Sequence, residues 1–314
     1  MIPYSYTQLV FFFFVYCFIG WCIETTWVSL HQKKFVNRGF MRGPFIPIYG
    51  FGAMALLLVG TPLLEWPIAV FFGGLLAASI LEYFTGMAME AIFKVRYWDY
   101  SDKPLNINGH VCLGTSLAWG LLALVEDYFL HKPIEALSEY LTLRELNLIT
   151  MAVGVYFIVD LTLSFKAAFD LRDMIIKMEK AKEELRLMQK RLDVVLAVVN
   201  ADAEAFVEER KEKYEERKEK AEDIAHDIEE KLDEIKKRME EAPMEYAEAA
   251  KEEFAEFRER LAEHRADHFG FTAFKDMYKR GTILGNPTMA SKKFKDSLDT
   301  LKAYVVEKSE KKDK

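Results

Sequence analysis

The chain has 314 residues, a formal net charge of -7, a hydrophobic fraction of 51% and three cysteines. The odd number of cysteines, without metal-ligand spacing, implies no disulfide framework, and no nucleic-acid-binding module appears. The charges are unevenly divided, because residues 1–170 carry only 10 of the 42 Lys and Arg and 13 of the 49 Asp and Glu. The first half therefore has the composition of a membrane domain, and the remainder that of charged helices.

Five apolar segments in the first half predict transmembrane helices. A bilayer core requires about 20 apolar residues per helix, and each segment meets that length. The first segment has neither a basic region before it nor a small-residue cleavage site after it, so we expect a helix and not a removable signal peptide. The predicted spans are residues 6–30, 45–64, 67–93, 109–129 and 146–169.

The connecting segments predict the direction of the chain across the membrane. Segment 31–44 holds four Lys or Arg and segment 94–108 holds three, whereas segment 61–66 holds none and segment 130–145 holds two. Basic residues concentrate in cytoplasmic loops. We therefore expect a multi-pass protein of the cytoplasmic membrane with its N-terminus outside and its C-terminal tail in the cytoplasm.

The tail has the pattern of a coiled coil. In segments 174–206 and 221–239, apolar residues follow alternating spacings of four and three. Pro243 should end this long helix, and a second amphipathic helix follows it. Further on, the pair Asn286-Pro287 predicts the N-terminus of a last short helix. The sequence leaves open whether the coiled coil closes within one chain or between two.

These patterns predict an all-α protein, a polytopic membrane helix bundle of about five transmembrane helices followed by a long cytoplasmic coiled-coil tail. The predicted parts are a transmembrane bundle at 1–169, a long coiled-coil helix at 170–242, and a helical return segment with short C-terminal helices at 243–314.

Acidic residues fall inside the predicted spans at positions that share a helix face. Glu82, Gly86 and Glu90 repeat every four residues on the third span, and Gly20 and Glu24 do so on the first. A carboxylate in hydrocarbon costs on the order of several kcal/mol unless it is neutralised, paired or facing water. We therefore expect these side chains to point into the bundle.

The segment NRGFMRGPFIPIYGFG, residues 37–52, places helix breakers and two arginines at the start of the second span. We predict non-helical backbone that is buried in protein at membrane depth and brings Arg38 and Arg42 to Glu24 and Glu82. The second and fourth spans begin on the same side of the membrane, so their N-terminal N–H groups favour an anion such as a lipid phosphate there.

The resulting candidate pocket either binds a ligand or is a static ion-pair network that holds the helices together. No catalytic residue, metal site or cofactor is assigned, because His264 and His268 lack a third ligand and no nucleotide-binding motif appears. The candidate pocket residues are Glu24, Asn37, Arg38, Arg42, Tyr49, Glu82, Glu90, Asp99, Asn106 and His110.

Five segments together resemble the bacterial family known as Putative ABC-transporter type IV, also called CmpB-like. The resemblance covers most of the first 125 residues, does not extend to the tail, and implies a multi-pass protein of the bacterial cytoplasmic membrane with a permease function. Transport by such a protein would require a partner ATPase or a dimer. The segments are GWCIE (20–24), NRGFMRGPFIPIYGFG (37–52), EYFTGMAMEAIF (82–93), RYWDYSDKPLNINGH (96–110) and SLAWG (116–120).

The leading hypothesis is a permease-like membrane protein whose cytoplasmic-side pocket binds an anionic or amphiphilic, lipid-like ligand. The expected partners are membrane lipid, an ATPase or other protein bound through the coiled-coil tail, and a second copy of the chain. One alternative is a membrane-anchored coiled-coil scaffold. A second alternative is an enzyme that acts on a lipid headgroup, although the sequence favours a non-enzymatic protein.

Overall fold

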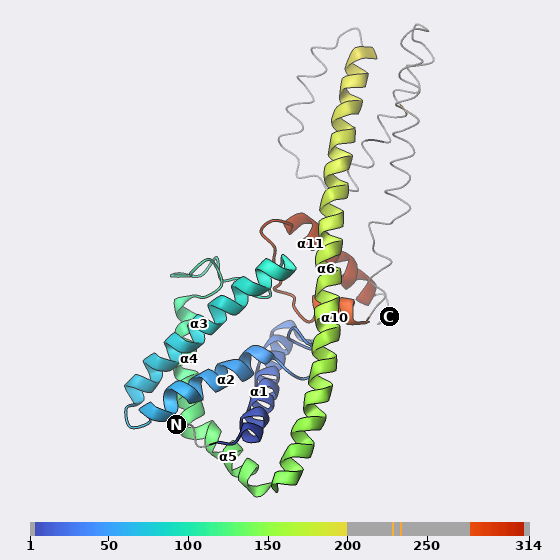
Figure 1. Cartoon of the computed structure of the whole chain (residues 1–314). Helices are drawn as coiled ribbons and strands as arrows, with labels where there is room; N and C mark the ends of the chain where they lie inside the picture. Colours follow the sequence, from blue (N-terminus) through green and yellow to red (C-terminus); the bar gives the residue numbers. More distant parts are fainter. Residues whose placement is uncertain (1–3, 200–227, 229–232, 234–276, 311–314) are drawn as a thin grey trace. The chain divides into compact units, whose positions relative to one another are not determined.

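The computed structural model describes residues 4–199, 228, 233 and 277–310 (Figure 1). The described residues form two compact units, of which the first contains residues up to Arg172 together with those from 277 onward. The elements are α1 (Tyr6–Gln32), α2 (Pro47–Gly60) with a 3-10 turn (Thr61–Leu63), α3 (Pro67–Phe93), α4 (Leu113–Val125), a π-helical turn (Glu126–Leu130), α5 (His131–Tyr140), α6 (Leu143–Val199), α10 (Met277–Leu284) and α11 (Lys295–Glu310).

Local sequence signals account for the ends of the first helices. Ser5 caps α1 in a capping box with Gln8, which satisfies free N–H groups of the first turn. Proline opens both α2 and α3, where its missing N–H costs no hydrogen bond because the first N–H groups of a helix have no partner within it. Lys33 and Lys94 adopt left-handed backbone conformations that end α1 and α3. The helices therefore begin and end where the sequence provides their caps.

Four helical segments are long and apolar enough to cross a membrane: Tyr6–Gln32, Pro67–Phe93, Leu113–Tyr140 and Leu143–Leu192. The predicted second span is shorter than expected, because α2 and its 3-10 turn cover only Pro47–Leu63. At 1.5 Å per residue for the 14-residue α2 and about 2.0 Å for each residue of the 3-10 turn, this segment is about 27 Å long, slightly less than the hydrocarbon core of about 30 Å. The described residues therefore contain four membrane-length helices and one shorter apolar helix, and the direction of the chain across the membrane stays a prediction.

Two predicted boundaries are wrong. The segment 130–145 was expected to be a loop, but α5 occupies most of it, because the helix after α4 continues through the π-helical turn. The pair Asn286-Pro287 lies in a turn between α10 and α11 and does not begin a helix. Most of the predicted coiled coil, the break at Pro243, and His264 and His268 lie outside the described residues.

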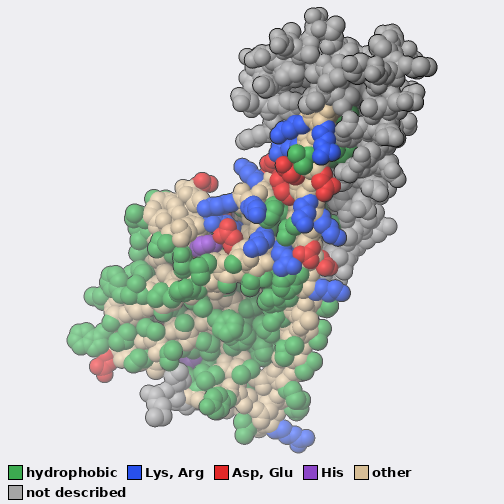
Figure 2. All heavy atoms as spheres, turned by 45° about the horizontal axis from the view of Figure 1, so that its top comes forward, with side chains coloured by type: hydrophobic (Ala, Val, Ile, Leu, Met, Phe, Trp, Pro, Cys, Tyr) green, Lys and Arg blue, Asp and Glu red, His purple; other side chains and the backbone are tan. Residues whose placement is uncertain are grey.

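Helix α3 shows how the bundle is built for an apolar environment. Its buried face carries Val70, Gly74, Ala78, Glu82 and Gly86, whereas large apolar side chains lie on an exposed stripe. Small residues on the buried face allow neighbouring helices to approach closely. Hydrophobic side chains also cover a broad area of the surface in Figure 2. The exposed stripe is Phe72, Leu76, Ile80 and Phe84, each more than half exposed.

Helices α1 to α4 pack around shared apolar clusters. Leu56 of α2, Val70 and Ala78 of α3, and Ala123 of α4 form one cluster. A second cluster joins α1 to α2, α5 and the start of α6. As a result of this packing, polar residues of α1, α2 and α3 face the same cavity.

Candidate functional site

The segment between α1 and α2 is buried without being helical, as the sequence predicts. Met41, Phe45 and Ile46 are buried, and the backbone N–H of Ile46 donates to the carbonyl of Cys17 on α1 at 3.1 Å. The N–H of Gly43 donates to the Asp160 carboxylate of α6 at 2.8 Å. Backbone groups that a helix would pair internally are thus satisfied by neighbouring helices.

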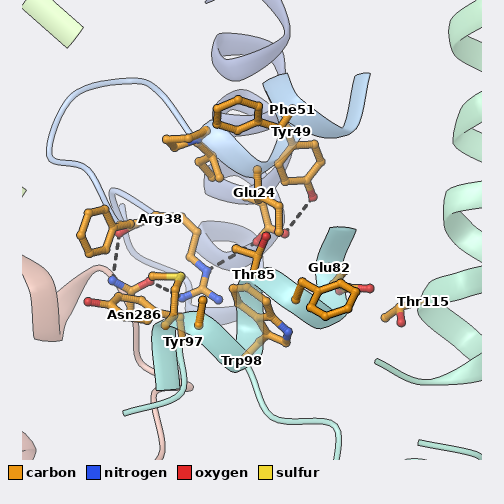
Figure 3. A pocket seen from close by; sticks show the side chains of 18 of the residues that line it. Glu24, Arg38, Tyr49, Phe51, Glu82, Thr85, Tyr97, Trp98, Thr115 and Asn286 are labelled. Atoms are coloured by element: carbon orange, nitrogen blue, oxygen red, sulfur yellow. Dashed lines mark hydrogen bonds and ion pairs between the residues drawn. The ribbon is translucent and has the colours of Figure 1, made fainter. Parts of the chain in front are cut away.

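This segment delivers Arg38 to Glu24. The Nε of Arg38 lies 3.5 Å from Oε2 of Glu24, and both side chains are at most one-third exposed. Arg38 also donates to the side-chain oxygen of Asn286 at 2.9 Å and to the backbone carbonyl of Gly285 at 3.3 Å. The predicted pairing of Arg38 with Glu24 is therefore present, and the guanidinium has further partners from the C-terminal segment (Figure 3).

Tyr49 joins Glu24 from the first turn of α2. Its hydroxyl donates to Oε1 of Glu24 at 2.9 Å (Figure 3). Its ring lies directly over Gly20, where the Cβ of any other residue would collide with the ring carbons. Gly20 and Glu24 are one turn apart on α1, so the glycine admits the ring and the carboxylate receives the hydroxyl.

Glu82 lies on the buried face of α3 and is 6% exposed. Its two oxygens accept hydrogen bonds from Trp119 Nε1 at 3.1 Å and from the Tyr100 hydroxyl at 3.4 Å. Both donors are neutral, and no described cation lies within ion-pair distance of Glu82. The predicted pairing of Arg42 with Glu82 is therefore wrong.

Glu24, Arg38, Tyr49 and Glu82 line one cavity of about 820 Å³. Most of the remaining lining is apolar or aromatic, from α2, α3, α4, α6 and the segments between them. The first turns of α2 and α4 also border it, through Pro47 and Thr115. The aromatic side chains include Phe40, Phe51, Phe84, Phe93, Tyr97, Trp98, Tyr100, Trp119, Phe157 and Phe165.

The C-terminal segment between α10 and α11 closes one side of this cavity. Asn286 is buried, lines the cavity, and donates to the carbonyls of Gly39 and Thr282, each at 2.9 Å. Arg96 and Ala290 exchange two backbone hydrogen bonds of 2.7 and 2.9 Å. The C-terminal segment is thus held by contacts to residues 247 and 194 positions earlier in the sequence.

A second polar network lies beside the cavity. Arg96 contacts Glu90 at 2.8 Å and Asp99 at 3.1 Å, and His110 Nε2 lies 3.1 Å from the same Glu90 oxygen. The predicted residues Glu90, Asp99 and His110 are therefore together, but none of them lines the cavity. Arg96 pairs with both carboxylates, which leaves one net negative charge on this network while His110 is neutral.

The surroundings of this network shift its pKa values. Burial, followed by the positive charge of Arg96, lowers the pKa of His110 despite the opposing effect of Glu90. Burial raises the pKa of Asp99, but hydrogen bonds from Ser101 and the charge of Arg96 outweigh it and lower the pKa overall. A neutral His110 that donates from Nε2 to Glu90 fits these directions.

Three other predicted residues have local structural contacts. Asn37 accepts from Trp21 Nε1 at 2.7 Å and donates to the carbonyl of Arg42. Arg42 packs against Gly281 of α10, and Asn106 accepts from the N–H of Gly109 at 3.0 Å. None of the three lines the cavity.

Sequence reasoning missed several residues of the site. Trp119 and Tyr100, the donors to Glu82, fall in the segments SLAWG and RYWDYS, where an aromatic residue with a polar atom was the available signal. No sequence signal connects Asn286 to Arg38. Among the described residues there is no group of three or more His, Cys, Asp or Glu that could hold a metal ion.

Long apolar helices with outward-facing hydrophobic side chains define a helical membrane protein. The comparison with protein families makes this more specific. Residues 11–165 match the model of the family described as Putative ABC-transporter type IV, which confirms the resemblance. No curated protein and no solved structure matches the chain.

Proposed function

We propose that this protein is a permease component of a membrane transporter and that its cavity binds an amphiphilic, lipid-like molecule. The observation that supports this proposal is the cavity of about 820 Å³, with aromatic walls and a small polar end at Glu24, Arg38, Tyr49 and Glu82. Small-molecule sites have volumes of roughly 300–1,000 Å³, mostly apolar linings and a few convergent polar groups. An acyl or aromatic body fits the walls, and a polar head fits the carboxyl groups.

The charges at the polar end favour a cationic or hydrogen-bond-donating head over an anionic one. Arg38 already contacts Glu24, Asn286 and Gly285, so an anion would have to displace these partners. Glu82 has only neutral donors among the described residues. A cation between this carboxyl group and the faces of nearby aromatic rings gains both Coulomb and cation–π energy.

We further propose that the polar end faces the cytoplasm, since the basic residues predict that side. The family description supports association with other transporter components. We assign the contact with an ATPase or with a second copy of the chain to residues after 170, most of which lie outside the described part.

The proposal is tested with the full-length protein purified in a mild non-ionic detergent. Thermal stability is measured during titration with amphiphiles that share one dodecyl chain and differ in the head: trimethylammonium, phosphocholine and phosphate. We expect saturable stabilisation by the trimethylammonium compound and weaker effects of the other two. Glu82→Gln should weaken its apparent affinity about tenfold, which corresponds to about 1.4 kcal/mol of lost interaction.

Glu65→Gln is the matched control, because Glu65 is an exposed carboxylate outside the cavity lining. Equal affinities for the wild type, Glu82→Gln and Glu65→Gln would overturn the assignment of the cavity. Preference for the phosphate head, lost in Arg38→Ala, would retain the cavity as the binding site and assign it an anionic ligand.

A further inference from the structure

A second buried polar cluster lies at the junction of α4 and α5, outside the cavity. The π-helical turn Glu126–Leu130 joins the two helices. Glu126, Asp127 and His131 are 3%, 7% and 5% exposed, within a segment apolar enough to cross a membrane. Single π-helical turns inside helices are frequent at functional sites. Ionisable residues buried in membrane helices often mark proton pathways.

The two carboxyl groups lack enough partners to be held as a static network. Glu126 Oε1 and Asp127 Oδ2 are buried and have no hydrogen-bond partner among the described residues. Asp127 packs directly against Gly60 of α2, where any Cβ would collide with the carboxyl oxygen. No described Lys, Arg or His forms an ion pair with either acid. A bound proton neutralises such a group without requiring any other ligand.

A chain of hydrogen-bonding groups leads away from Glu126. The Tyr16 hydroxyl of α1 lies 3.0 Å from His131 Nδ1, and it is a neighbour of the Glu126 carboxyl group without a formed hydrogen bond to it. His131 Nε2 lies 3.0 Å from the Tyr4 hydroxyl. The partly exposed Glu135 is in turn a neighbour of Tyr4, without a formed hydrogen bond to it. The sequence of groups is therefore Glu126, Tyr16, His131, Tyr4 and Glu135.

We propose that Glu126 carries an exchangeable proton and that Tyr16, His131 and Tyr4 relay this proton between Glu126 and Glu135. In the inward direction, Tyr16 gives its proton to Glu126 and receives one from His131 Nδ1. His131 Nε2 receives the Tyr4 proton, and Tyr4 receives one from Glu135. Each intermediate group gains one proton and loses one. The net result is protonated Glu126, deprotonated Glu135 and the other neutral tautomer of His131.

The chemistry of each group suits this relay. A neutral imidazole has one donor and one acceptor nitrogen, and a tyrosine hydroxyl both donates and accepts, so the chain works in either direction. The other titratable groups that face it are Asp127, beside Glu126, and Glu139, near Tyr4. From α2, the described neighbours include Gly60, Ala53 and Leu57, none of which titrates. The relay does not depend on the amphiphile proposed for the cavity.

Infrared spectroscopy of the purified full-length protein tests the relay. A protonated buried carboxyl group gives a C=O stretching band that is separate from the carboxylate bands and shifts when its proton exchanges with deuterium. We expect one such band to be absent in Glu126→Gln and present in Glu65→Gln. After transfer to heavy water, we expect the band to exchange about tenfold more slowly in Tyr16→Phe than in the wild type, the factor given by a barrier higher by about 1.4 kcal/mol.

Tyr140→Phe is the matched control, because Tyr140 lies at the end of α5 and is 87% exposed. In Tyr140→Phe, the protonated-carboxyl band should exchange at the wild-type rate. A spectrum in which Glu126→Gln removes no protonated-carboxyl band would overturn the proton site. Equal exchange rates in Tyr16→Phe, Tyr4→Phe and Tyr140→Phe would overturn the relay, even if Glu126 holds a proton.

Discussion

Arg38 should hold the C-terminal segment against the membrane domain, and Arg38→Ala should release it. Within the first unit, Arg38 donates to Asn286 at 2.9 Å, to the Gly285 carbonyl at 3.3 Å and to the Thr288 hydroxyl at 3.3 Å. These bonds join the segment before α2 to the turn between α10 and α11. Their loss removes the polar contacts of one guanidinium while the apolar packing remains.

The magnitude follows from these three bonds. A hydrogen bond contributes about 0.5–1.5 kcal/mol net, and the two bonds of 3.3 Å belong at the low end of that range. The total is about 1.5–2.5 kcal/mol, so the population of molecules with a detached C-terminal segment should rise roughly 12- to 60-fold. The bond from Asn286 to Gly39 and the backbone pair between Arg96 and Ala290 remain, so detachment should stay incomplete.

Amide hydrogen exchange followed by mass spectrometry measures this population peptide by peptide. In Arg38→Ala, peptides from residues 277–294 should exchange faster by that factor, whereas peptides from α3 should be unchanged. Lys34→Ala is the matched control, because Lys34 is an exposed basic residue of the same segment. Unchanged exchange of residues 277–294 in Arg38→Ala would refute the inference that this arginine anchors the C-terminal segment.

Two further predictions concern packing and pH. Gly20→Leu should destabilise the folded protein by about 1–3 kcal/mol, because the leucine side chain would occupy the space of the Tyr49 ring. Thermal unfolding measures this loss. Gly154→Ala is the control, because its position has more space, and its stability should be near that of the wild type. The lowered pKa of His110 means that the unfolded chain binds its proton first as the pH falls through about 6.5. The melting temperature should therefore decrease below that pH, and a His110→Gln variant with the full wild-type decrease would contradict this reasoning.

At the polar end of the cavity, the sequence predicts the contacts between residues that lie close together in the chain. Gly20 and Glu24 share a face of α1 by helical spacing, and Tyr49 follows directly from the start of α2 at Pro47. Arg38 meets Glu24 because the intervening segment is short. These contacts follow from helical periodicity and from the high energy of an unpaired charge in an apolar environment.

Other parts of the site depend on packing between distant elements, which periodicity does not report. Arg42 packs against Gly281 instead of pairing with Glu82, because α10 lies beside the segment that carries it. The π-helical turn at Glu126 has no sequence signature, and the acidic pair at its start fell within the predicted fourth span without being singled out. The interior position of this pair results from continuing helix, in which α5 follows α4 with no break.

Helix α1 connects the two buried polar clusters through one face. Tyr16, Gly20 and Glu24 follow at intervals of four residues, so they form a single stripe about 12 Å long. Tyr16 contacts His131 at one end, and Glu24 contacts Tyr49 at the other. Helix α1 is therefore the structural element that the two buried polar clusters share, and its small residue Gly20 lies between them.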